Sequence, residues 1–117
     1  MQLKDMRVWQ KAMDLVEEVY LITSHFPTTE KFALASQLQR AATSVPLNIS
    51  EGFGRETSAD KANKYVIARG ECTEAHTILL TSARLKFVST EKIQKAVTLC
   101  DEIGKMLSGL IKKYSKH

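Results

Sequence analysis

Three side chains near the middle of the chain, Arg69, Cys72 and His76, have types and spacings that could support chemistry. Cys72 and His76 are four residues apart, so on a helix both would lie on one face and could bind the same metal ion. A zinc site needs two more ligands, and the sequence contains no second pair of this kind. We therefore predict no metal site and no cofactor, and we interpret the pair as a buried thiol and a hydrogen-bonded histidine.

Arg69 and His76 are separated by six residues, a spacing that resembles the active-site motif of HEPN-type helical ribonucleases. In such an enzyme the histidine would take a proton from a ribose hydroxyl, and the arginine would stabilise charge on the phosphate. The polar residue that usually stands next to the arginine is missing, because Gly70 occupies that position. We therefore predict that the protein is not an enzyme, and we keep an RNA-cleaving site at Arg69 and His76 as an alternative.

The stretch from Ser36 to Arg55 carries an apolar stripe and a polar stripe, each at helical spacing. The polar stripe runs along the edge of the apolar one, where polar groups need hydrogen-bond partners. Charged residues further along the chain could supply those partners. We predict a half-buried polar network that fixes the register of the packed helices, with the members Gln37, Arg40, Asn48, Glu51, Arg55, Arg69 and Glu74.

The composition is that of an ordinary globular domain. A length of 117 residues suits one domain, and 44% hydrophobic with 26% charged residues excludes a disordered or collagen-like chain. No apolar run approaches the length of a membrane span, and the N-terminus lacks the apolar region of a signal peptide. We therefore predict a cytoplasmic protein that makes no membrane contact and keeps Cys72 and Cys100 as buried thiols.

Hydrophobic periodicity predicts four amphipathic helices and no strand. Their expected ranges are residues 5–24, 30–54, 58–86 and from about residue 90 through residue 114. The connections between them are short, so neighbouring helices should be antiparallel. The sequence therefore predicts an all-α fold, an up-down-up-down four-helix bundle that forms a single domain over residues 1–117.

Local signals refine the two central helices. Pro46 leaves a backbone carbonyl without its helical donor and should kink the second helix. Gly52 and Gly54 can take the left-handed conformation that closes a helix. Thr57 should cap the third helix, with Asp60 three residues further on.

Apolar residues also occur on a side of the third helix that is otherwise polar. Ile67, Ile78 and Leu85 lie among charged residues, where exposed apolar side chains are typical of a subunit interface. These residues favour self-association or a site for a protein partner. A protein–protein interaction scaffold is therefore a second functional hypothesis.

The basic balance of the chain favours contact with a polyanion. The formal net charge is +4, and basic residues concentrate near both ends of the sequence. The alternative interpretation is that these are solvated helix ends with cations near a helix dipole. The candidate nucleic-acid-binding residues are Lys4, Arg7, Lys11, Lys105, Lys112, Lys113 and Lys116.

Several segments resemble one known family. The opening Asp5–Ala12, the turn His25–Pro27, the segment Ser36–Arg55 and the later Ala68–Gly70 are similar to the 23S rRNA intervening-sequence proteins, also called four helix bundle proteins. The resemblance covers nearly the whole chain. Gln39 and His76 depart from it, since the family commonly has an arginine and a glutamate at these positions.

The resemblance implies an antiparallel four-helix bundle that assembles as a homopentamer. It also implies a bacterial protein encoded within an insertion in a large-subunit rRNA gene or elsewhere in the genome. The family is similar to the accessory variability determinant of diversity-generating retroelements, a basic pentamer that binds nucleic acid and a reverse transcriptase. No enzymatic activity is established for the family. Together with the positive charge, this favours an oligomeric, non-enzymatic bundle that binds RNA or DNA.

Overall fold

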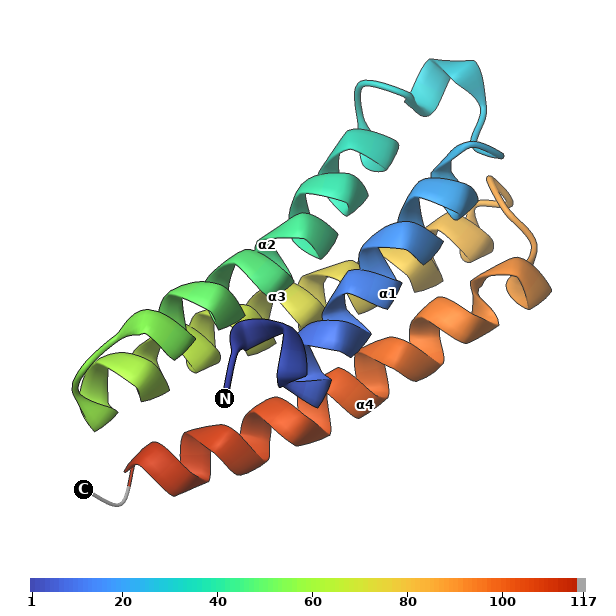
Figure 1. The fold of residues 1–117 in the computed structure, drawn as a ribbon. Helices are drawn as coiled ribbons and strands as arrows, with labels where there is room; N and C mark the ends of the chain where they lie inside the picture. The colour runs from blue at the N-terminus through green and yellow to red at the C-terminus, as the bar shows by residue number, and fades with distance from the viewer. Residues whose placement is uncertain (116–117) are drawn as a thin grey trace.

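The computed structural model describes residues 1–115, and it has the predicted all-α architecture. Its long helices are α1 (Arg7–Thr23), α2 (Leu34–Gly54), α3 (Ser58–Arg84) and α4 (Thr90–Ser115), with short 3-10 helices η1 (Leu3–Asp5) and η2 (Thr28–Glu30). The part of the chain that the structure describes contains no strand. Consecutive long helices run in opposite directions along a body of 46 × 22 × 21 Å (Figure 1).

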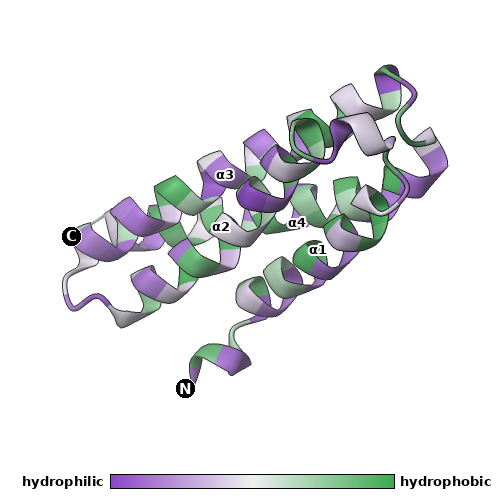
Figure 2. Cartoon of the chain, turned by 90° about the horizontal axis from the view of Figure 1, so that it is seen from above, coloured by the Kyte–Doolittle hydropathy of each residue, from purple (hydrophilic) through white to green (hydrophobic). Residues whose placement is uncertain are grey.

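The helices pack in a ring in which each has two neighbours. Helix α1 contacts α2 and α4, while α3 contacts α2 on one side and α4 on the other. Hydrophobic and hydrophilic residues are interspersed along the helices, as Figure 2 shows in green and purple. The apolar stripes meet inside the bundle, where Leu15, Leu38, Leu79 and Leu107 are fully buried. Burial of these stripes is the main source of stability for such helices.

The predicted helix limits hold to within a few residues, with one larger difference. Helix α2 begins at Leu34 rather than near residue 30, because η2 and a turn occupy residues 28–33. Helix α3 ends at Arg84, and Lys86 follows in a left-handed conformation with φ of 65°. Over residues 1–115, no helix is both long and apolar enough to span a membrane.

The prediction that Gly52 and Gly54 close α2 in a left-handed conformation was wrong. No glycine among the described residues has a positive φ, and α2 ends with Arg55 in an extended conformation. Gly52 is required for a different reason. A Cβ atom at Gly52 would lie 2.7 Å from Cε1 of Tyr65, so the missing side chain lets α2 and α3 approach closely.

Two further local predictions concern Pro46 and Thr57. Helix α2 continues through Pro46, whose carbonyl oxygen accepts a hydrogen bond of 2.8 Å from Oγ of Ser50. Thr57 caps α3 as predicted, since its Oγ1 accepts a hydrogen bond of 3.1 Å from the backbone N–H of Asp60. The cap satisfies one of the free donors at the start of the helix.

The prediction that Ile78 is exposed was also wrong. Its side chain is 7% exposed and belongs to the core, because α3 packs against neighbours on two sides and therefore has a wide buried face. Ile67 and Leu85 are 40% and 55% exposed, as predicted. Val66 and Leu80 are exposed as well, although their positions in the sequence pattern did not single them out.

Candidate nucleic-acid interface

Basic residues from distant parts of the sequence meet at one end of the bundle. Helices α1 and α3 begin there, and α2 and α4 end there (Figure 1). Arg7, Lys61 and Lys113 line a common pocket of about 580 Å³ at this end. Phe53 and Tyr114 line the same pocket. We call this pocket the basic end, and we include in it the lining residues Arg7, Lys61 and Lys113 and the exposed Lys4, Arg55 and Lys112, which are close to the lining residues in sequence.

Lys61 is held in place by the backbone of the preceding helix. Its Nζ donates hydrogen bonds to the carbonyl oxygens of Gly52 (3.2 Å) and Phe53 (2.9 Å), where the partial negative charge of the α2 dipole favours a cation. The same Nζ lies 5.9 Å from the ring centre of Tyr114. Lys61 therefore supports the pocket, and its position on α3 was not singled out by the sequence.

Arg7 and Lys113 keep their charges available. Both side chains are exposed, and within residues 1–115 neither has an acidic partner within 4.0 Å. The Nζ of Lys113 lies 5.3 Å from the ring centre of Tyr114, which places a cation beside an aromatic ring. Free cations interleaved with aromatic rings suit a polyanion that also offers planar bases.

The other candidate basic residues differ in their surroundings. Lys4 and Lys112 belong to the basic end and are exposed. Lys11 pairs with Glu102 at 2.8 Å and links α1 to α4, so its charge is already neutralised. Lys105 lies instead in a groove between α3 and α4. Lys116 lies outside the described residues.

The predicted polar network is present in part, as two separate clusters between α2 and α3. Arg40 donates a hydrogen bond of 2.8 Å to Oε2 of Glu71 and a second hydrogen bond to Glu74. These contacts, led by the one with Glu71, raise the pKa of Arg40. Glu51 pairs with Lys64 at 2.8 Å, and that hydrogen bond lowers the pKa of the Glu51 carboxyl.

Of the remaining predicted residues, Arg55 adds to the effect of Lys64 in lowering the pKa of Glu51, whereas Arg69, Asn48 and Gln37 do not join these clusters. Arg69 lies on the other side of α3 and donates a hydrogen bond of 3.2 Å to Oγ of Ser108 on α4. The reason is helical geometry, since Arg69 and Glu71 are about 200° apart around α3. Asn48 donates to the Ser44 carbonyl oxygen within its own helix (2.8 Å), and Gln37 is exposed. The described contacts therefore do not join all seven residues into one network.

Arg69 and His76 line one groove between α3 and α4, which has a volume of about 450 Å³. His76 Nδ1 lies 3.9 Å from Oδ1 of Asp101. Cys72 and Cys100 are both buried beside the groove, and Sγ of Cys72 donates to the carbonyl oxygen of Cys100 at 3.4 Å. The neighbouring Cys72 thiol, together with burial, raises the pKa of the Cys100 thiol. Over residues 1–115, no cluster of three or more metal-binding side chains is placed to hold a metal ion.

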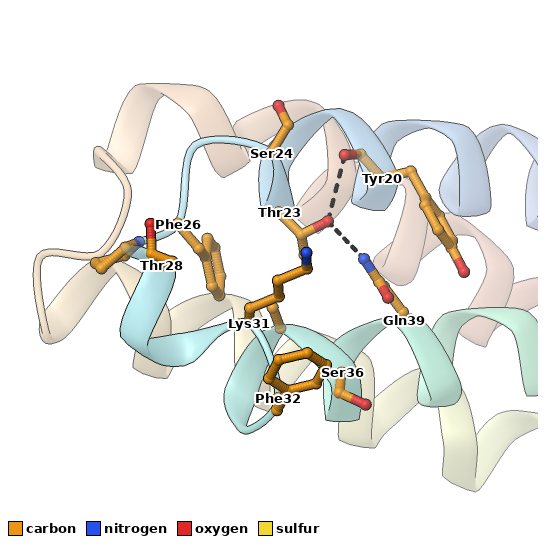
Figure 3. Close-up of a pocket in the computed structure, with 11 residues that line it drawn as sticks. Tyr20, Thr23, Ser24, Phe26, Thr28, Lys31, Phe32, Ser36 and Gln39 are labelled. Atoms are coloured by element: carbon orange, nitrogen blue, oxygen red, sulfur yellow. Dashed lines mark hydrogen bonds between the residues drawn. The ribbon is translucent and has the colours of Figure 1, made fainter.

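A further pocket lies at the opposite end of the bundle, between the end of α1 and the start of α2 (Figure 3). Gln39 Nε2 donates to Oγ1 of Thr23 at 3.0 Å and ties these two helices together. Phe32 is 89% exposed, and Lys31 Nζ lies 5.7 Å from the centre of its ring. Lys31 is the single cation among the described side chains that line this pocket, so its positive charge is weaker than that of the basic end.

Comparison with known proteins identifies the family. The family model of the 23S rRNA-intervening sequence protein matches residues 4–109. A crystal structure from Bacteroides thetaiotaomicron, described as a protein with unknown function from the S23 ribosomal protein family, is similar, with a TM-score of 0.83 and 26% sequence identity. The similarity covers 90% of this chain and 98% of that one. No curated protein matches. The chain belongs to the 23S rRNA-intervening sequence protein family.

Proposed function

We propose that this chain is a cytoplasmic, non-enzymatic protein that binds nucleic acid, RNA or DNA, through its basic end. The observation that supports this proposal is the convergence of Arg7 and Lys113, from opposite ends of the sequence, on one pocket with Tyr114 and Phe53. The free cations would contact backbone phosphates, and the aromatic rings would stack on exposed bases. The net charge of +4 acts in the same direction by attracting a polyanion from a distance.

Phosphate contacts make affinity depend on salt in a characteristic way. Each lysine or arginine that neutralises a phosphate releases condensed counterions, so the logarithm of the affinity falls linearly with the logarithm of the salt concentration. The test is a titration of labelled structured RNA and duplex DNA at several salt concentrations. The proposal expects binding that weakens steeply with salt, and the comparison of probes identifies the preferred polymer. Failure to bind either probe at low salt would refute it.

We also propose that the chain acts as an oligomer. The resemblance to the intervening-sequence proteins suggests a homopentamer, and the exposed apolar side chains on α3 support an interface between copies. These side chains are Val66, Ile67 and Leu80 within α3 and Leu85 directly after its last residue. An oligomer would repeat the basic end several times, and simultaneous contacts of these copies with one nucleic acid would raise the overall affinity. The same surfaces are the basis of the alternative function, a scaffold for a protein partner.

A further inference from the structure

The groove between α3 and α4 has more basic than acidic groups along its length. Its basic side chains are Arg69 and His76 from α3 and Lys105 from α4. Asp101 is the one carboxylate among the described residues that line it. The carboxylate lies next to His76, with 3.9 Å between Oδ1 and Nδ1. Arg69 and Lys105 have no acidic partner within 4.0 Å in the part of the chain that the structure describes.

Arg69 differs in this respect from the other arginine that bridges two helices. The guanidinium of Arg40 forms ion pairs with two carboxylates, those of Glu71 and Glu74. Arg69 is half-buried, and its described side-chain contact is a single hydrogen bond to a neutral hydroxyl, that of Ser108. A guanidinium has five N–H donors in a planar fork, so most of the donors of Arg69 remain available. Such a group can bind two oxygens of one anion at the same time.

The groove is open where a side chain could have filled it. Gly104 lines it from α4, and a Cβ atom added there would meet no heavy atom within 4 Å. Gly104 is therefore not needed for close packing, although a glycine inside a helix costs about 1 kcal/mol relative to alanine. Its effect on the structure is to keep the groove between Arg69, His76 and Lys105 accessible.

We propose that this groove binds a phosphate group, held by the guanidinium of Arg69, the ammonium of Lys105 and the hydroxyl of Ser108. Two cations from two helices and a hydroxyl donor match the several oxygens and the negative charge of a phosphate. The phosphate can belong to a free nucleotide or to the backbone of a nucleic acid, and the chemistry of the groove is the same for both. The site is separate from the pocket at the basic end, because the two pockets share no lining residue.

The test measures binding of three probes to the wild-type protein by calorimetry: inorganic phosphate, adenosine monophosphate and a short oligouridylate. Arg69→Gln removes the charged fork, and Gly104→Leu fills the groove without changing any charge. Lys92→Gln, an exposed position near the start of α4, serves as the control. Thermal unfolding followed by circular dichroism checks that each variant is folded.

The proposal expects at least one probe to bind the wild type and to bind about tenfold more weakly to Arg69→Gln, the loss typical of a charge-assisted hydrogen bond. Gly104→Leu should weaken binding of the same probe, because the added side chain occupies the groove. A loss seen with adenosine monophosphate assigns the groove to a free phosphate ester, and a loss confined to oligouridylate assigns it to a backbone phosphate. Failure of all three probes to bind the wild type, or affinities that are equal in the wild type and in both folded variants, would overturn the proposal. Reversing the charges of Arg7 and Lys113 by substitution with glutamate tests the basic end independently, and this change should leave binding of adenosine monophosphate unchanged.

Discussion

At the scale of single residues, the contact between Gly52 and Tyr65 sets the distance between α2 and α3. Tyr65 is 1% exposed, so its ring is enclosed and has little space to move away from α2. Burial also raises the pKa of the Tyr65 hydroxyl, so its ring is even less readily charged than that of a free tyrosine. A residue with a side chain at position 52 must therefore displace either the ring or the helix.

Gly52→Ala should lower the free energy of unfolding by about 1–3 kcal/mol, the usual cost of overpacking a filled core. The measurement is urea unfolding at equilibrium. Gly54→Ala is the matched control in the same helix, since a Cβ atom there meets nothing within 4 Å. That variant should be neutral or slightly stabilising, because alanine has the higher helix propensity. Equal effects of the two substitutions would contradict the role of Gly52.

The Glu51 carboxyl should titrate below its ordinary value of 4.5, because Lys64 donates a hydrogen bond to its charged form. Because the pKa of Glu51 is lower in the folded state than in the unfolded state, this carboxyl stabilises the folded protein at pH values above its unfolded-state pKa. The contribution disappears as the pH falls through the folded-state pKa. Carboxyl titration by nuclear magnetic resonance should show the Glu51 pKa rising toward 4.5 in Lys64→Gln. Lys95→Gln, at the other end of the bundle, should leave it unchanged.

Single-residue predictions from the sequence succeeded where the signal was local. The Thr57 cap and the buried cysteines follow from residue type and spacing, and both are found in the structure. Gly52 and Lys61 could not be interpreted in the same way, because their roles depend on residues of another helix. The two ion-pair clusters were only partly predictable for the same reason, since Lys64 and Glu71 became partners of α2 only through packing.

At the scale of elements, helix periodicity was enough to predict the four long helices. The start of α2 was less predictable, because residues 28–33 form η2 and a turn rather than another turn of α-helix. The extent of the buried face of α3 also could not be predicted from the sequence of that helix alone. Ile78 is buried because α3 packs against both α2 and α4, a fact of the assembled bundle.

Thr57→Ala should destabilise the protein by about 1 kcal/mol, because it leaves the Asp60 N–H at the start of α3 without an acceptor. Thr57→Ser retains the hydroxyl and should recover most of the loss. The readout is the midpoint of thermal unfolding for the wild type and the two variants. A Thr57→Ser variant as unstable as Thr57→Ala would show that the methyl group, and not the cap, is what matters.

At the scale of the whole molecule, the antiparallel order of the helices places both basic segments of the sequence at one end. This arrangement follows from short connections and an even number of helices, so it could be predicted from the sequence. The pocket formed by Arg7, Lys113 and the aromatic rings could not be predicted, because it depends on how far α4 extends beside α1. Lys11 and Lys105 look equivalent to Arg7 in the sequence but have other surroundings in the bundle.

Ile67→Glu and Leu85→Glu should shift the mass measured by light scattering toward that of the monomer, because a charge in an apolar interface is costly to desolvate. Both side chains are exposed in the single chain, so the helix itself should remain folded. Thr98→Glu places the same charge at an exposed polar position of α4, away from this face, and should leave the mass unchanged. An unaltered oligomer in both apolar variants would exclude this face as the interface.

The most direct test of the central claim compares two double charge reversals. Arg7→Glu with Lys113→Glu alters the basic end, while Lys31→Glu with Lys92→Glu alters the opposite end and changes the net charge by the same amount. Binding to the preferred polymer is measured as a function of salt. If nucleic acid binds at the basic end, the first variant should lose at least about tenfold in affinity, and its salt slope should fall by about one for each lost phosphate contact, while the second stays close to the wild type. Equal losses in both variants would mean that binding follows net charge alone and would contradict the account.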